Sequence, residues 1–146
     1  MKRILCILVL MLPIIGCGGG SSSSYSGPGV TNSSGNESRS IVGKWELIFP
    51  GSLCEETYDF KSNNNFTINS LDEISSGTYT FTSVTSTRYK LTMTITADNG
   101  EADCEGDSSD DTGLTGTLYI EFSGTTAIRW FESQTSTTVL RTMTKV

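Results

Sequence analysis

The chain has 146 residues, a formal net charge of −6 and no histidine. The missing histidine excludes Ser–His and Cys–His nucleophile pairs, and every metal site that needs an imidazole ligand. The acidic balance makes nucleic acid and anionic lipid surfaces poor partners. We therefore expect a protein that is not an enzyme, has no cofactor and binds no nucleic acid.

The beginning of the chain has the layout of a secretory signal. A positive start is followed by an apolar run at residues 4–15 and then by Gly16 and Cys17. The run is shorter than the ~20 residues that a membrane-spanning helix needs, and a small residue before the cut is typical of export signals. The sequence IIGC at residues 14–17 resembles the lipobox of bacterial lipoproteins. This resemblance implies that residues 1–16 are removed and that Cys17 carries lipid, palmitate included, which holds the protein to a membrane.

The composition changes sharply after Cys17. Residues 18–40 consist largely of Gly, Ser and Asn, and such a stretch buries too little apolar surface to fold, so residues 17–40 are predicted to form a lipidated flexible tether. No Asp follows Cys17. This resembles the pattern sent to the outer membrane in Gram-negative bacteria, so we expect a lipid-anchored protein of the cell envelope. Residues 41–146 have the length of one domain.

Apolar and polar residues alternate with period two through this domain, most clearly at residues 89–97 and 114–122. Such alternation predicts strands with one face in a core and one in water. Short turn clusters between strands favour antiparallel neighbours. We predict an all-β fold, an up-and-down eight-stranded barrel, with a two-sheet β-sandwich as the alternative. The expected strands are 42–49, 54–61, 65–70, 77–83, 88–97, 114–123, 125–132 and 137–144.

The first expected strand opens with Gly43-Lys44-Trp45, which resembles the G-x-W motif of the lipocalin and wider calycin superfamily. The segments ETYDF at 56–60 and GTYTF at 77–81, and a closing Leu-Arg pair, are similar to small bacterial lipocalin-like domains. The resemblance implies that Trp45 packs across a closed barrel end against an Arg or Lys from the last strand. Arg141 is the residue expected there, with Arg129 as the alternative.

The resemblance also implies a function, the binding of a small apolar ligand inside the barrel. The side chains expected to point inward are Tyr58, Phe60, Phe66, Tyr79, Phe81, Leu91, Met93, Leu118 and Phe122. These same side chains can instead fill an eight-stranded barrel completely. In that case the domain would be a protein-interaction or inhibitor module of the cell envelope, with another envelope protein as its partner.

Two cysteines remain in the domain once Cys17 carries lipid, and an exported domain favours their pairing. Cys54 follows the first expected strand and Cys104 follows the fifth. In an up-and-down barrel the loops after odd-numbered strands share one end. The sequence therefore predicts a disulfide between Cys54 and Cys104, with two free thiols as the alternative.

The loop that contains Cys104 is strongly acidic, with seven carboxylates in residues 98–111. Oxygen-rich loops bind calcium, but this one lacks the turn glycine and the bidentate Glu of an EF-hand. We expect mainly a solubilising rim and no dedicated metal site. A weak cation site at Asp103, Glu105 and Asp107 is the alternative.

Overall fold

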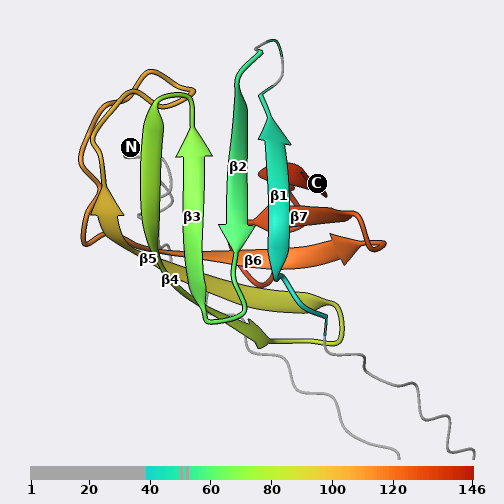
Figure 1. Ribbon diagram of the computed structural model, residues 1–146. Helices are drawn as coiled ribbons and strands as arrows, with labels where there is room; N and C mark the ends of the chain where they lie inside the picture. Colours follow the sequence, from blue (N-terminus) through green and yellow to red (C-terminus); the bar gives the residue numbers. More distant parts are fainter. Residues whose placement is uncertain (1–38, 50, 52) are drawn as a thin grey trace, which may run out of the picture.

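The computed structural model describes residues 39–49, 51 and 53–146, and these form a closed eight-stranded barrel in which every neighbouring pair is antiparallel. Cys17 and most of the tether lie outside the described residues. In Figure 1, β1 to β3 form the front wall and β5 to β7 run crosswise behind them. The predicted up-and-down barrel is confirmed, and the β-sandwich alternative is wrong. The strands are β1 (Gly43–Ile48), β2 (Glu55–Phe60), β3 (Asn65–Ser70), β4 (Glu73–Ser83), β5 (Arg88–Asp98), β6 (Thr115–Ser123), β7 (Ala127–Phe131) and β8 (Arg141–Lys145).

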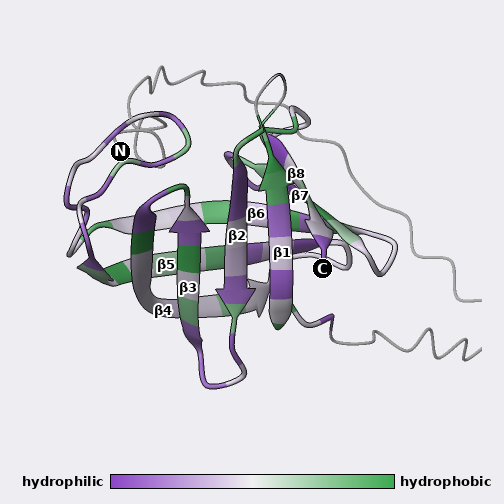
Figure 2. Ribbon diagram, turned by 45° about the horizontal axis from the view of Figure 1, so that its top comes forward, coloured by the Kyte–Doolittle hydropathy of each residue, from purple (hydrophilic) through white to green (hydrophobic). Residues whose placement is uncertain are grey.

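Hydrophobic and hydrophilic residues alternate along the strands, as the colour bands of Figure 2 show. Along β5, Tyr89, Leu91 and Met93 are buried, whereas the Thr side chains between them face outward. Outward Thr residues pair across strands: Thr92 and Thr117 lie 3.0 Å apart through their hydroxyls. This pattern is what a sheet with one wet face requires.

Two strands begin four residues away from the predicted ranges, whereas the others agree within two residues at each end. β4 begins at Glu73 rather than at residue 77, because Leu71 and Asp72 alone make the turn from β3. Leu71 adopts a left-handed conformation with φ of 55°, which is rare for a bulky residue and leaves no Gly or Pro signal in the sequence. β8 begins at Arg141 rather than at residue 137, because the preceding residues fold over the outside of the barrel.

The barrel has two unlike ends. The connections β1–β2, β3–β4, β5–β6 and β7–β8 share one end, which we call the mouth. The chain enters at the other end, where Ile41 is 1% exposed and its carbonyl accepts a 2.7 Å hydrogen bond from Trp45 Nε1. The ammonium of Lys145 lies 5.4 Å from the centroid of the Trp45 ring. Trp45 therefore closes this end under a cation from the last strand.

The expected partner of Trp45 requires a correction. Lys145, the direct register partner of Trp45, takes the position, and neither Arg141 nor Arg129 does. Arg141 lies at the mouth, where its guanidinium is 6.0 Å from the ring of Phe49. Arg129 faces outward and pairs with Glu121 at 3.2 Å. The register between β1 and β8 decides this, since it brings the end of β8 to the closed end of the barrel.

Candidate functional site: the seam pocket at the barrel mouth

The barrel closes through an incomplete seam between its first and last strands. Among the described residues, β1 and β8 share only the register pairs Trp45–Lys145 and Glu46–Thr144. By comparison, β1 pairs with β2 along its whole length. The two strands thus separate toward the mouth. The last residues of β1 and the first residues of β8 do not pair with each other there.

A pocket of about 450 Å³ occupies this separation, and we call it the seam pocket. Binding pockets for small molecules commonly have volumes of roughly 300–1,000 Å³. The walls are largely aliphatic and aromatic, and Arg141 supplies the charged group. The lining residues are Leu47, Ile48, Phe49, Val139, Leu140, Arg141 and Thr142.

Arg141 places its guanidinium at the inner edge of the seam pocket. It pairs in register with Trp130, whose side chain is in the core, so both share the inner face of the barrel. Its Nη2 lies 4.0 Å from Glu105 of the mouth loop, and about half of the Arg141 side chain is exposed. The guanidinium can therefore meet a polar group on a ligand whose apolar part lies between the strands.

The carboxyl group of Glu56 on β2 is close enough to Arg141 for the two charges to interact. It accepts a 2.7 Å hydrogen bond from the hydroxyl of Tyr58. Burial raises the pKa of Glu56 to about 7, although the Tyr58 hydrogen bond and Arg141 act in the opposite direction. Burial also raises the pKa of Tyr58 well above its usual value, with the charge of Glu56 as the next cause. The Glu56 carboxyl group beside the seam pocket is thus about half protonated near pH 7.

The nine side chains expected to point inward all lie in the core or pack against it. Their aromatic rings contact one another: the ring centroids of Phe60 and Tyr79 lie 5.1 Å apart, and those of Phe81 and Phe122 lie 6.2 Å apart. Leu91 is fully buried. The middle of the barrel is therefore packed by its own side chains, and the pocket found at the mouth is lined by different residues.

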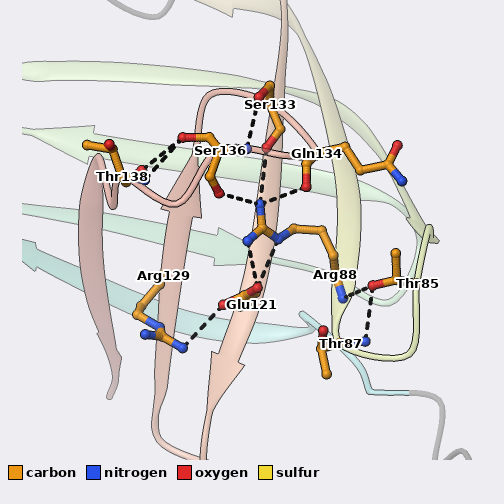
Figure 3. A network of polar contacts seen from close by, with 9 residues as sticks. All are labelled: Thr85, Thr87, Arg88, Glu121, Arg129, Ser133, Gln134, Ser136 and Thr138. Carbon is orange, nitrogen blue, oxygen red and sulfur yellow. Dashed lines mark hydrogen bonds and ion pairs between the residues drawn. The ribbon is translucent and has the colours of Figure 1, made fainter. Parts of the chain in front are cut away.

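A polar network outside the barrel positions one wall of the seam pocket (Figure 3). Arg88 Nη1 donates to the carbonyl oxygens of Ser133, Gln134 and Ser136, each at 3.1 Å. Its Nη2 lies 2.6 Å from Glu121, and its guanidinium stacks 3.9 Å above the Phe131 ring.

This network holds the 132–140 connection, which we call the strap, against β5 and β6. The strap ends where the Leu140 amide donates to the Trp130 carbonyl at 2.8 Å. Val139 and Leu140 of the pocket wall are thereby fixed. This role of Arg88 could not be predicted from the sequence, because its position in the alternation of β5 is one that faces water.

The predicted disulfide is confirmed. Cys54 and Cys104 are bonded, with their Cα atoms 5.6 Å apart, and the bond ties the β1–β2 connection to the β5–β6 connection at the mouth. Both connections lie close to the seam pocket. The bond therefore restrains the loops around the pocket opening.

The acidic loop is more ordered than a solvated rim. Asp103 is only 5% exposed, and its Oδ1 accepts hydrogen bonds from the backbone amides of Glu105 and Asp107 at 2.9 and 2.8 Å. Asp103 thus organises the turn around Cys104. Within the part of the chain that the structure describes, no group of three or more Cys, Asp or Glu side chains is placed to hold a metal ion.

Comparison with models of known protein families, with curated proteins and with solved structures gives no match. Within residues 39–49, 51 and 53–146, no helix is long and apolar enough to cross a membrane. The barrel is of the kind that the lipocalin resemblance implies. The seam pocket therefore has to be interpreted from its own geometry.

Proposed function

We propose that the protein is a lipid-anchored, lipocalin-like binding protein of the cell envelope that holds a small apolar ligand in the seam pocket. The observation that carries this proposal is the aliphatic and aromatic pocket of about 450 Å³ at the place where β1 and β8 separate. Burial of a ligand against Leu47, Phe49 and Leu140 would remove apolar surface from water, which is the main driving force for such binding.

The proposed anchor agrees with the position of this pocket. Lipid on Cys17 would attach the protein to a membrane, the outer membrane in a Gram-negative host, through the tether. The chain enters the barrel at the end closed by Trp45, and the seam pocket opens at the mouth. A ligand could then enter from the side of the domain that points away from the attachment.

Native mass spectrometry of the protein purified from its host tests the binding proposal. Val139→Trp places an indole in the seam pocket from a position that is already 39% exposed, so the fold should tolerate it. Val146→Trp is the matched control, because Val146 is exposed at the opposite end. We expect a bound small molecule in the wild type and in the control, and its loss in Val139→Trp. A bound mass that persists in Val139→Trp would place the ligand elsewhere.

A second function, a protein-interaction or inhibitor module of the envelope, is favoured by a different observation. The core is packed with aromatic side chains, and aliphatic side chains are exposed at the mouth: Ile48 is 56% and Leu53 fully exposed. Exposed apolar residues next to a pocket are common at interaction sites. A photo-crosslinking residue at Leu53, compared with one at Val146, should then capture an envelope protein from intact cells only at Leu53.

A further inference from the structure

The inner face of the barrel becomes polar toward the mouth. This part lies beneath the 99–114 connection, which we call the mouth loop. The core is apolar near Trp45, but Ser70, Glu73 and Ser75 are each only 2% exposed near the mouth. Asp103 and Asp111 of the mouth loop are each 5% exposed. Buried carboxylates without a compensating partner are costly, so this cluster needs a physical explanation.

Glu73 lies beside one more carboxyl group, that of Asp98 at the end of β5. Ser75 and Asp98 are register partners on β4 and β5, so Glu73, two residues before Ser75, is the diagonal neighbour of Asp98 on the same inner face. Glu73 Oε1 and Asp98 Oδ2 are both buried and have no hydrogen-bond donor among the described residues. Two carboxylates in such proximity cannot both be ionised at low cost, and one proton between them supplies the missing donor.

We propose that Glu73 and Asp98 share one proton at neutral pH, with Glu73 as the acid that donates to Asp98, and that this hydrogen bond is a latch holding the mouth loop closed. Loss of the proton in alkaline solution leaves two buried negative charges side by side. The latch then opens and releases the mouth loop as far as the disulfide allows. This inference does not depend on ligand binding in the seam pocket.

The mouth loop is attached directly around the pair. The amides of Asp72 and Glu73 donate to the carbonyl of Ala102 at 3.1 and 3.2 Å. Asp98 Oδ1, the other oxygen of its carboxyl group, accepts a 2.7 Å bond from the Gly100 amide. A change in the charge of the pair therefore acts on residues that begin the loop and on residues in its middle.

The charges that face Glu73 favour its protonated form. Burial raises its pKa to about 8, and Asp98, Asp103 and Asp111 add to the shift through their charges and, for Asp98, a side-chain hydrogen bond. From β2, Tyr58 also faces Glu73. The guanidinium of Arg141 on β8 acts on Tyr58 and on Glu56, whose own pKa is raised by burial. The hydroxyl oxygen of Ser70 on β3 accepts a 3.0 Å hydrogen bond from the Cys104 amide.

The titration of the Glu73 carboxyl group in the oxidised full chain tests the shared proton. Carbon-13 NMR of carboxyl-labelled glutamate follows it, and Glu73→Gln assigns its signal by removing it. We expect the signal to titrate above neutral pH. A Glu73 signal that titrates near the ordinary glutamate value would overturn the proposal, and this measurement on the wild type needs no variant to fold.

Hydrogen exchange of the Glu73 and Cys104 amides tests the latch. The measured quantity is the protection factor, which is the exchange rate of an unstructured chain divided by the observed rate at the same pH. In the wild type we expect protection to fall by up to about tenfold per pH unit as pH rises from 5 toward 8, and to level off above pH 8, because the Glu73 pKa is about 8 in the closed state and near 4.5 when the loop is open. Glu73→Gln keeps a donor toward Asp98 without a titrating proton, so its protection should stay constant. Glu101→Gln, at an exposed carboxyl of the same loop, should behave like the wild type.

The same series with calcium chloride and with a chelator distinguishes a proton from a metal ion. Wild-type protection that is insensitive to both supports the shared proton. If calcium restores protection at pH 9 in the wild type and not in Glu73→Gln, a cation holds the pair and the proposal is wrong. Equal loss of protection in the wild type and in Glu73→Gln would also contradict it, because the loop would then open for another reason.

Discussion

Arg88 and Glu121 are direct register partners on β5 and β6, and the guanidinium Nη2 of Arg88 lies 2.6 Å from Glu121 Oε1 on the outer face of the barrel. Outer-face ion pairs are normally exposed and weak. Here the strap covers the pair, and the Arg88 side chain is only 10% exposed. The three carbonyl groups that Arg88 binds all belong to the strap, which also forms a wall of the seam pocket.

Arg88→Ala should lower the free energy of unfolding by roughly 2–4 kcal/mol, because it removes the Arg88 donors from Glu121 Oε1 and from three strap carbonyls. Lys90→Ala, an exposed site on the same strand, should change it by less than ~0.5 kcal/mol. Urea denaturation measures both. An Arg88→Ala effect no larger than that of Lys90→Ala would show that the network does not hold the strap.

The sequence predicted the barrel well where alternation is regular, as in β5, where each residue from Tyr89 to Ile95 falls on the expected face. It also predicted the disulfide, because up-and-down topology alone places Cys54 and Cys104 at one end. These features depend on local pattern and strand order, which can be read along the chain.

The candidate site could not be predicted in the same way. The seam pocket depends on how far β1 pairs with β8, strands from opposite ends of the domain, and no local pattern encodes that register. Arg88 occupies an outward position and is buried only by the strap. Glu73 is a buried acid in a segment read as a turn, because Leu71 supplies a left-handed turn conformation without the usual glycine.

Gly77→Ala should destabilise the fold strongly. A Cβ atom at this position would lie 1.9 Å from the carbonyl oxygen of Thr94, at the irregular register between β4 and β5. Backbone must move to admit the methyl group, and we expect a loss of about 2–3 kcal/mol or more. Thermal denaturation followed by circular dichroism measures it. Gly124→Ala is the control for spatial crowding, since nothing lies within 4 Å of its added Cβ, although its positive φ adds some strain.

Removal of the disulfide by Cys54→Ser with Cys104→Ser should lower the stability of the barrel by roughly 4 kcal/mol. The bond closes a loop with a sequence separation of 50 residues, and the chain-entropy model gives this magnitude for such a loop. Denaturant midpoints of the wild type with and without a reducing agent, beside the double variant, provide the measurement. If reduction leaves the midpoint unchanged, the mouth loops do not depend on the bond.

The stability of the barrel should fall as pH rises from 5 to 8 and then level off. The folded-state pKa values of Glu56 and Glu73, about 7 and about 8, lie above the ordinary value of 4.5, so the folded chain holds these protons more tightly than the unfolded chain. Their contribution is complete below pH 4.5 and is lost as pH rises through the two folded-state values. Asp110, whose pKa is lowered by its hydrogen bond with Thr112, acts only in more acidic solution.

Thermal unfolding midpoints at intervals of one pH unit measure this dependence. Glu56→Gln should make the decline between pH 5 and pH 7 shallower and leave the decline between pH 7 and pH 8, which belongs to Glu73. A midpoint that is constant or rises between pH 5 and pH 8 would contradict the raised pKa values of both groups.

Ligand-induced changes in the amide NMR spectrum test the seam pocket most directly. The molecule that co-purifies with the protein, or a small apolar probe such as a naphthalene dye, is titrated into the oxidised protein and the shifted amides are mapped. The proposal predicts saturable shifts concentrated at residues 47–49 and 139–142, with small changes at Leu91 and Phe66 in the packed core. Shifts concentrated at Leu91 and Phe66, or no saturable shifts for either ligand, would contradict binding in the seam pocket.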